Sequence, residues 1–142
     1  LIGERTAENI KIAIGTALPL AEELRLPVAG RDLATGLPKT IEFSSSESYL
    51  SLRDSVKQIA DVVKQTIESC PPELVSDILE RGIVLAGGVA RLRCIDTMLS
   101  RETGVPVVVA ENALTAVAEG TGIALEEIEI YKRILKDKRF AS

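Results

Sequence analysis

The sequence predicts an α/β fold from three features: two strand-length apolar runs, a helix between them, and a long amphipathic helix before them. The apolar runs are residues 83–86 and 105–109, and the long helix begins near residue 45. Apolar strands joined by a helix are typical of a parallel βαβ unit. Such a pair needs neighbouring strands and cover on both faces. We therefore expect further strands from residues upstream of these 142, or from another molecule.

The first 44 residues predict a helix followed by two strands. Residues 4–17 carry apolar side chains on one helical face, and a glycine and a proline mark the end of this helix. Within residues 23–44, two runs alternate apolar and polar residues around glycine-containing turns, which is typical of strands. Pro27 indicates that the first strand lies at a sheet edge, because proline cannot donate to the hydrogen-bond ladder.

Capping residues mark the next helices. Ser44 and Glu47 fit a capping box at the start of the long helix, and two prolines after Cys70 end it. A shorter helix is then predicted from Pro72, closed by Gly82. These signals agree with the α/β assignment because they separate the helical segments from the strands.

The prolines also predict a boundary between two lobes. The smaller lobe, residues 1–70, contains the first helix, the two strands and the long helix. The larger lobe, residues 71–142, contains the βαβ unit, with helices predicted at 90–102 and from residue 113 toward residue 136.

The composition narrows the classes of function. A chain that is 46% hydrophobic and 27% charged is typical of a soluble globular protein, and its net charge of −4 opposes binding to nucleic acid. The absence of histidine excludes a Ser-His or Cys-His nucleophile within the chain. We interpret Cys70 and Cys94 as small core residues in a reducing compartment. No signal peptide is visible, and no apolar run approaches the ~20 residues that span a bilayer, so we expect no direct membrane anchor.

A glycine pair after the first apolar run is the strongest candidate for a binding site. Gly87 and Gly88 connect a predicted strand to a predicted helix. Glycine lacks Cβ, so a flat ligand could lie against the backbone, and the start of the helix offers free N–H donors. The alternative is a tight turn that needs glycine for its own geometry. The sequence is neither a GxGxxG motif nor a Walker loop, so it does not by itself predict a pyrophosphate site.

The first helix carries a second candidate. Glu8 and Lys11 are three residues apart and share a helix face. A carboxylate at this position could accept hydrogen bonds from ribose hydroxyls, while a lysine stem could lie over a purine ring. The alternative is an ordinary surface ion pair, worth ~0.2–0.5 kcal/mol.

These segments, taken together and in order, resemble the MreB/Mbl family of bacterial actins over residues 1 to about 125. The matching segments are Ile2-Gly3-Glu4, Thr6-Ala7-Glu8-Asn9-Ile10-Lys11, Cys70-Pro71-Pro72-Glu73-Leu74, Asp77-Ile78, Glu80-Arg81-Gly82, Gly87-Gly88 with Leu92-Arg93 and Asp96, Glu102-Thr103-Gly104-Val105-Pro106-Val107, and Leu114-Thr115-Ala116-Val117-Ala118. The resemblance implies an actin-like, ribonuclease-H-type ATPase domain. The chain would be part of its second domain, with a small inserted α/β lobe.

The resemblance also implies a nucleotide site made of two segments, a helix that closes over adenine and ribose and a loop that holds adenosine. The residues carried over are Glu8, Asn9, Ile10, Lys11, Ile12, Gly87, Gly88, Val89, Ala90, Arg91 and Leu92. The family usually has a third glycine where this chain has Val89, so its Cβ could narrow the approach to the base. Arg91 stands where the family more often has an apolar residue, and its stem could cover the adenine face.

The function implied is that of the nucleotide-binding half of an MreB-like actin homologue, whose ATP-dependent filaments direct cell shape and wall synthesis. The cofactor would be ATP with Mg²⁺, whose phosphate and metal sites belong to a first domain outside this chain. No catalytic residue and no metal ligand is therefore expected here, and ATP hydrolysis is expected only of the full-length protein. The implied location is the cytoplasm, at the inner face of the cell membrane.

The partners implied are other copies of the protein, in the filament, and membrane-associated proteins of cell elongation and wall synthesis; no nucleic acid is expected. Two alternatives stay open from the residues alone. One is another actin-superfamily ATPase, such as a sugar kinase or an Hsp70-type chaperone. The other is a non-enzymatic interaction module in which the glycine pair is only a turn.

Overall fold

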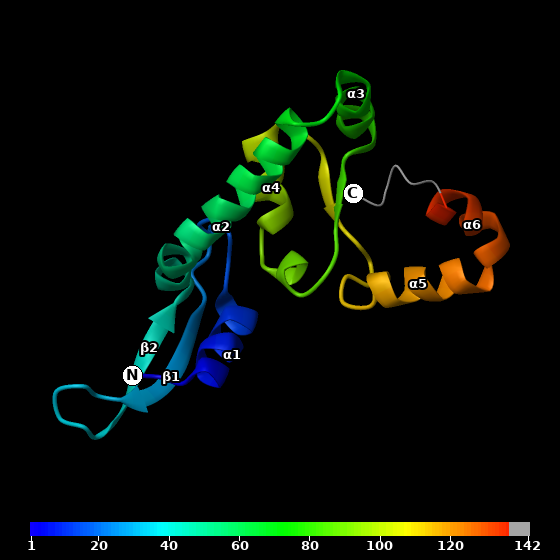
Figure 1. The fold of residues 1–142 in the computed structure, drawn as a ribbon. Helices are drawn as coiled ribbons and strands as arrows, with labels where there is room; N and C mark the ends of the chain where they lie inside the picture. Colours follow the sequence, from blue (N-terminus) through cyan, green and yellow to red (C-terminus); the bar gives the residue numbers. More distant parts are fainter. Residues whose placement is uncertain (137–142) are drawn as a thin grey trace.

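The computed structural model describes residues 1–136 and has the predicted α/β architecture (Figure 1). The last six residues of the predicted larger lobe, 137–142, lie outside the described part. The elements in order are α1 (Glu4–Ile14), β1 (Arg25–Arg31), β2 (Pro38–Ser44), α2 (Ser45–Glu68), α3 (Pro72–Arg81), β3 (Ile83–Leu85), the 3₁₀ turn η1 (Val89–Arg91), α4 (Ile95–Thr103), β4 (Val107–Val109), α5 (Ala116–Glu126) and α6 (Ile128–Lys136).

The two N-terminal strands form the predicted hairpin. β1 and β2 pair antiparallel, with Arg25 opposite Ser44 and Arg31 opposite Pro38. Helix α1 packs against β1 through a small core of Ile10, Ile14 and Val28. Figure 1 shows this hairpin at one end of the molecule and the α5–α6 pair at the opposite end.

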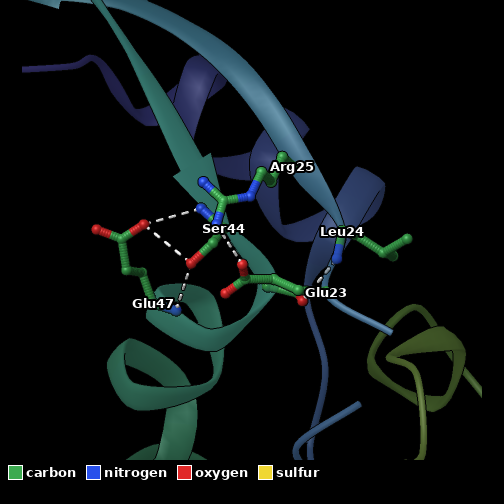
Figure 2. Close-up of polar contacts among 6 residues, drawn as sticks. Glu23, Leu24, Arg25, Ser44 and Glu47 are labelled. Atoms are coloured by element: carbon green, nitrogen blue, oxygen red, sulfur yellow. Dashed lines mark hydrogen bonds and ion pairs between the residues drawn. The ribbon is translucent and has the colours of Figure 1, made fainter. Parts of the chain in front are cut away.

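The predicted capping box is present at the start of α2 (Figure 2). The Ser44 hydroxyl accepts from the Glu47 N–H at 3.2 Å, and the Glu47 carboxylate accepts from the Ser44 N–H at 2.9 Å. The backbone of Leu24 is tied to the same turn, because its N–H donates to the Ser45 hydroxyl at 3.1 Å and its carbonyl accepts from the Ser45 N–H at 2.8 Å. The base of the hairpin is therefore fixed to the start of the long helix.

The larger core lies between α2 and α4. Its buried members are Ala17, Val56, Ala60, Ile95, Met98, Leu99 and Val107. Residues on both sides of position 70 contribute to it, so the two predicted lobes share a packed interface. The division at residue 70 itself stays a prediction.

The parallel βαβ unit is confirmed, but its strands are less buried than predicted. β3 and β4 pair in parallel, with Val84 opposite Val108. Ile83, Leu85 and Val107 face the core below them. Val84 and Val108 point to the other face of the pair and are 65% and 55% exposed. The cover that this pair needs on both faces is present on only one face within these 136 residues, which leaves Val84 and Val108 exposed.

Three predicted helices have different bounds. The first ends at Ile14 rather than residue 17, because the segment after Gly15 leaves the helix. The predicted 90–102 helix is interrupted: η1 ends at Arg91, and α4 begins only at Ile95, after Cys94 in a left-handed conformation at φ 60°. The predicted 113–136 helix is preceded by a turn at residues 113–115 and divides into α5 and α6.

Two further sequence expectations concern cysteines and membranes. Cys70 and Cys94 were expected in the core but are only half-buried. Cys70 follows the C-terminal end of α2 and Cys94 is the N-cap of α4, so neither lies on the packed face of a helix. Among the described residues, no helix combines the length and the apolar character that a membrane span requires.

An exposed ion pair between Lys64 of α2 and Glu102 of α4 predicts a pH dependence of stability. The hydrogen bond from Lys64 lowers the pKa of Glu102 below its ordinary 4.5. The same contact raises the pKa of Lys64 above its ordinary 10.5. The pair should therefore stabilise the fold fully between pH 4.5 and pH 10.5, the ordinary pKa values of the two groups. Its contribution should be lost as the pH falls through the lowered pKa of Glu102 or rises through the raised pKa of Lys64.

Urea unfolding of wild type and Glu102→Gln checks this prediction. The difference in midpoint should be largest near neutral pH and should shrink in acid, and it should be modest because both side chains are exposed. Glu42→Gln, which removes an exposed carboxylate on β2, is the control. A midpoint difference that persists unchanged into strong acid would contradict the assignment.

Candidate functional site

An open pocket lies where β3 and β4 end. It has a volume of about 650 Å³ and is lined by residues of the two loops that follow these strands. In parallel α/β sheets, ligands bind at the carboxyl ends of the strands. The lining residues are Ala90, Arg91, Leu92, Val109, Ala110, Glu111, Asn112, Ala113, Leu114 and Thr115.

The two glycines of the turn have different roles. Gly87 has φ +88°, a conformation that favours glycine, and its N–H donates to the Ala113 carbonyl at 2.6 Å. Its identity is therefore explained by the turn. Gly88 has an ordinary right-handed backbone at φ −64°, and a Cβ added there would approach only Leu114 Cδ2, at 3.9 Å. Neither backbone nor packing requires glycine at Gly88, and neither of the two glycines is among the residues that line the pocket.

The turn η1 places three of the predicted residues in the pocket wall. Ala90 is buried, Leu92 is half-buried and Arg91 is exposed at the rim. Val89 is 57% exposed and does not line the pocket, so its Cβ does not narrow the cavity as expected. The predicted helix start is a 3₁₀ turn of three residues.

The predicted residues of α1 lie apart from the pocket lining. Glu8 and Lys11 form an ion pair at 2.6 Å on the helix surface, where Asn9 and Ile12 are also exposed. Ile10 is 7% exposed and packs in the core with Val28. A ligand in the pocket would have to extend beyond it to reach the exposed side of α1.

A short segment connects α1 to the pocket wall. Thr16 pairs with Arg93 in an isolated parallel bridge, and the Ala17 N–H donates to the Arg93 carbonyl at 2.8 Å. A Cβ added to Gly15 would lie 3.1 Å from Leu92 Cδ1. The C-terminal end of α1 is thus held directly against the residues that line one side of the pocket.

The chemistry of the pocket suits a flat, largely apolar group with a few polar edges. Small side chains at Ala90, Ala110 and Ala113 leave space, while Glu111 and Asn112 bring polar groups to the opposite wall. Arg91 and Glu111 are the two charged residues of the lining. The described residues bring together no group of three potential metal ligands.

The loop of residues 110–115 was missed as a site by the sequence analysis, which assigned it to a helix start. The signal that could have found it was the predicted parallel pairing. Two parallel strands end at the same edge of a sheet, so the loop after β4 has to meet the loop after β3. The bond between Gly87 and Ala113 joins these two loops.

The fold is an actin-like α/β architecture, of which this chain contains part. The solved structure of MreB5 of Spiroplasma citri bound to ADP superimposes with a TM-score of 0.85, at 37% identity, over 95% of this chain and 40% of that one. The structure of the same protein bound to AMPPNP gives a TM-score of 0.85 at 36% identity, over 93% of this chain and 40% of that one.

The family model described as MreB/Mbl protein matches residues 1–133, so the chain belongs to the MreB/Mbl family. It is 47% identical to the cell shape-determining protein Mbl of Bacillus cereus, over 96% of this chain and 41% of that protein. It is 50% identical to the cell shape-determining protein MreB of Escherichia coli, over 92% of this chain and 38% of that protein. The chain thus spans about two fifths of the length of these curated relatives.

Proposed function

We propose that this chain is the nucleotide-binding half of an MreB-like actin homologue that determines cell shape. The observation that carries the proposal is the pocket of about 650 Å³ between residues 90–92 and the loop after β4. It lies in a fold shared with a relative whose solved structures are bound to ADP and AMPPNP. The names of the similar curated proteins support the role in cell shape.

The chain's own residues would bind and orient the nucleoside end of ATP. Ala90, Leu92 and Ala113 would contact the purine ring, and the Arg91 stem would cover one of its faces. Glu111 and Asn112 would meet its polar edge. Glu8 and Lys11, on the exposed side of α1, would reach the ribose once the nucleotide extends out of the pocket. ATP bound here would supply the phosphoanhydride bond that the full-length protein hydrolyses.

The remaining parts of the proposal concern the whole protein. Mg²⁺ and the phosphates would be held by residues outside this chain. The protein would self-associate into ATP-dependent filaments, which its family membership supports. The filaments would lie at the inner face of the cell membrane, with proteins of cell elongation and wall synthesis as partners.

Gly88→Leu tests the nucleotide site. Its backbone conformation accepts any residue, and a side chain added there would approach Leu114, which lines the pocket. We expect the Kd for ADP to rise about tenfold or more, a loss of about 1.4 kcal/mol, with little change in the urea midpoint. Titration calorimetry on the native protein measures the affinity.

Gly120→Leu is the matched control, because Gly120 lies in α5 and no atom lies within 4 Å of a Cβ added there. It should leave the ADP affinity unchanged. If Gly88→Leu binds ADP as tightly as wild type, the ligand does not lie in this pocket. If the wild-type protein shows no heat protection by ADP or ATP, the interaction-module alternative is favoured, since a ligand at 100 times its Kd adds ~2.7 kcal/mol.

A further inference from the structure

The segment Gly15–Ala17, here called the joint, holds the end of α1 against Leu92 and Arg93. These contacts lie within the protein and do not depend on a ligand. Thr16 at its centre is 0% exposed. The Thr16 hydroxyl donates to the Leu18 carbonyl at 2.7 Å and lies 3.4 Å from the Arg93 carbonyl. That carbonyl also accepts from the Ala17 N–H at 2.8 Å. The Ala17 N–H and the Thr16 hydroxyl therefore meet the same carbonyl, where two chain segments that are 77 residues apart cross.

The joint has no free space on the side of α1. A Cβ added to Gly15 would lie 2.3 Å from the Lys11 carbonyl oxygen and 3.1 Å from Leu92 Cδ1. The last turn of α1, the joint and Leu92 are therefore in direct contact. Because Leu92 lines the pocket and Lys11 belongs to the predicted ribose-contacting face, a displacement at the joint would move one relative to the other.

We propose that Thr16 is a positioning residue, which holds α1 and the pocket wall in the relative placement that a nucleotide needs; this inference rests on the proposed function. A ligand that contacts two segments binds more tightly when both are already placed, because less conformational freedom is lost on binding. The Thr16 hydroxyl contacts no part of the pocket lining. Its effect on affinity is therefore transmitted through the Thr16–Arg93 bridge and the contact of Gly15 with Leu92.

A merely structural threonine would change stability alone, and the chain offers a matched control for that case. The Thr103 hydroxyl, at the end of α4, donates to the Leu99 carbonyl at 2.8 Å and accepts from the Val105 N–H at 3.3 Å. Thr16→Val and Thr103→Val each remove the hydrogen bonds of one hydroxyl and keep the shape of the side chain. Thr16→Ser keeps the hydroxyl and serves as the rescue variant.

The experiment measures the ADP Kd by calorimetry and the urea midpoint for all three variants in the native protein. We expect both valine variants to lower the urea midpoint. Only Thr16→Val should raise the ADP Kd, by about fivefold or more. Thr16→Ser should bind ADP like wild type. Equal Kd values for Thr16→Val and Thr103→Val overturn the inference. If wild type binds ADP and Thr16→Val does so unchanged, only the inference fails. If wild type does not bind ADP, the proposed function fails with it.

Hydrogen exchange on the wild-type protein tests the same inference without a variant, in case Thr16→Val does not fold. ADP should slow the exchange of the Ala17 amide, which bonds to Arg93 across the joint. The Gly104 amide, bonded to Ser100 at 2.9 Å at the far end of α4, should be unaffected. Equal protection of both amides, or protection of neither, would show that the joint does not respond to the nucleotide.

Discussion

Replacing Gly82 with alanine should lower the free energy of unfolding by about 2–6 kcal/mol. Gly82 ends α3 with φ +80° and ψ −171°, a backbone conformation that is essentially restricted to glycine. A Cβ there would also lie 2.6 Å from the Pro106 carbonyl oxygen. That carbonyl accepts from the Ile83 N–H at 2.8 Å, where the β3–β4 ladder begins. The alanine would therefore strain its own backbone and push apart the strands that end at the pocket.

Gly104→Ala separates these two causes. Gly104 also ends a helix, at φ +71°, but no atom lies within 4 Å of its added Cβ. The free energy of unfolding of this variant should fall by only about 1–2 kcal/mol, the cost of placing alanine in a left-handed conformation. Urea unfolding of both variants measures the difference. Similar losses for the two variants would show that the contact with Pro106 is relieved by a backbone shift.

Leu99→Ala should lower the free energy of unfolding by about 2–5 kcal/mol. Leu99 is 2% exposed and lies in the core that joins α2, α4 and β4. Truncation removes buried apolar surface and leaves a cavity that the surrounding helices fill only in part. Because this core holds β4 beneath the loop of residues 110–115, we also expect weaker ADP binding near the unfolding transition.

Leu50→Ala is the control for this core substitution, since Leu50 lies on α2 and is 61% exposed. Its effect should stay within about 0.5 kcal/mol. Thermal and urea unfolding followed by circular dichroism measure both variants. A loss below about 1 kcal/mol for Leu99→Ala would mean that the core between α2 and α4 repacks, against the packing described above.

The local elements of this protein follow from short stretches of sequence. The alternation within residues 23–44 predicted the hairpin, Ser44 and Glu47 predicted the capping box, and the apolar runs around residues 83 and 107 predicted the parallel pair. Each depends on side-chain spacing or on contacts between residues a few positions apart. The ordered motifs also indicated the family, which the match over residues 1–133 confirms.

The shape of the candidate site was decided by contacts between residues far apart in the chain. The helix predicted over 90–102 is broken because Arg93 pairs with Thr16, 77 positions earlier. The loop of residues 110–115 belongs to the pocket because Gly87 binds the Ala113 carbonyl. The two glycines, alike in sequence, differ because only Gly87 takes a left-handed backbone. Periodicity and capping report on local backbone preferences alone, whereas these features arise where separate segments compete for the same hydrogen-bonding groups and space.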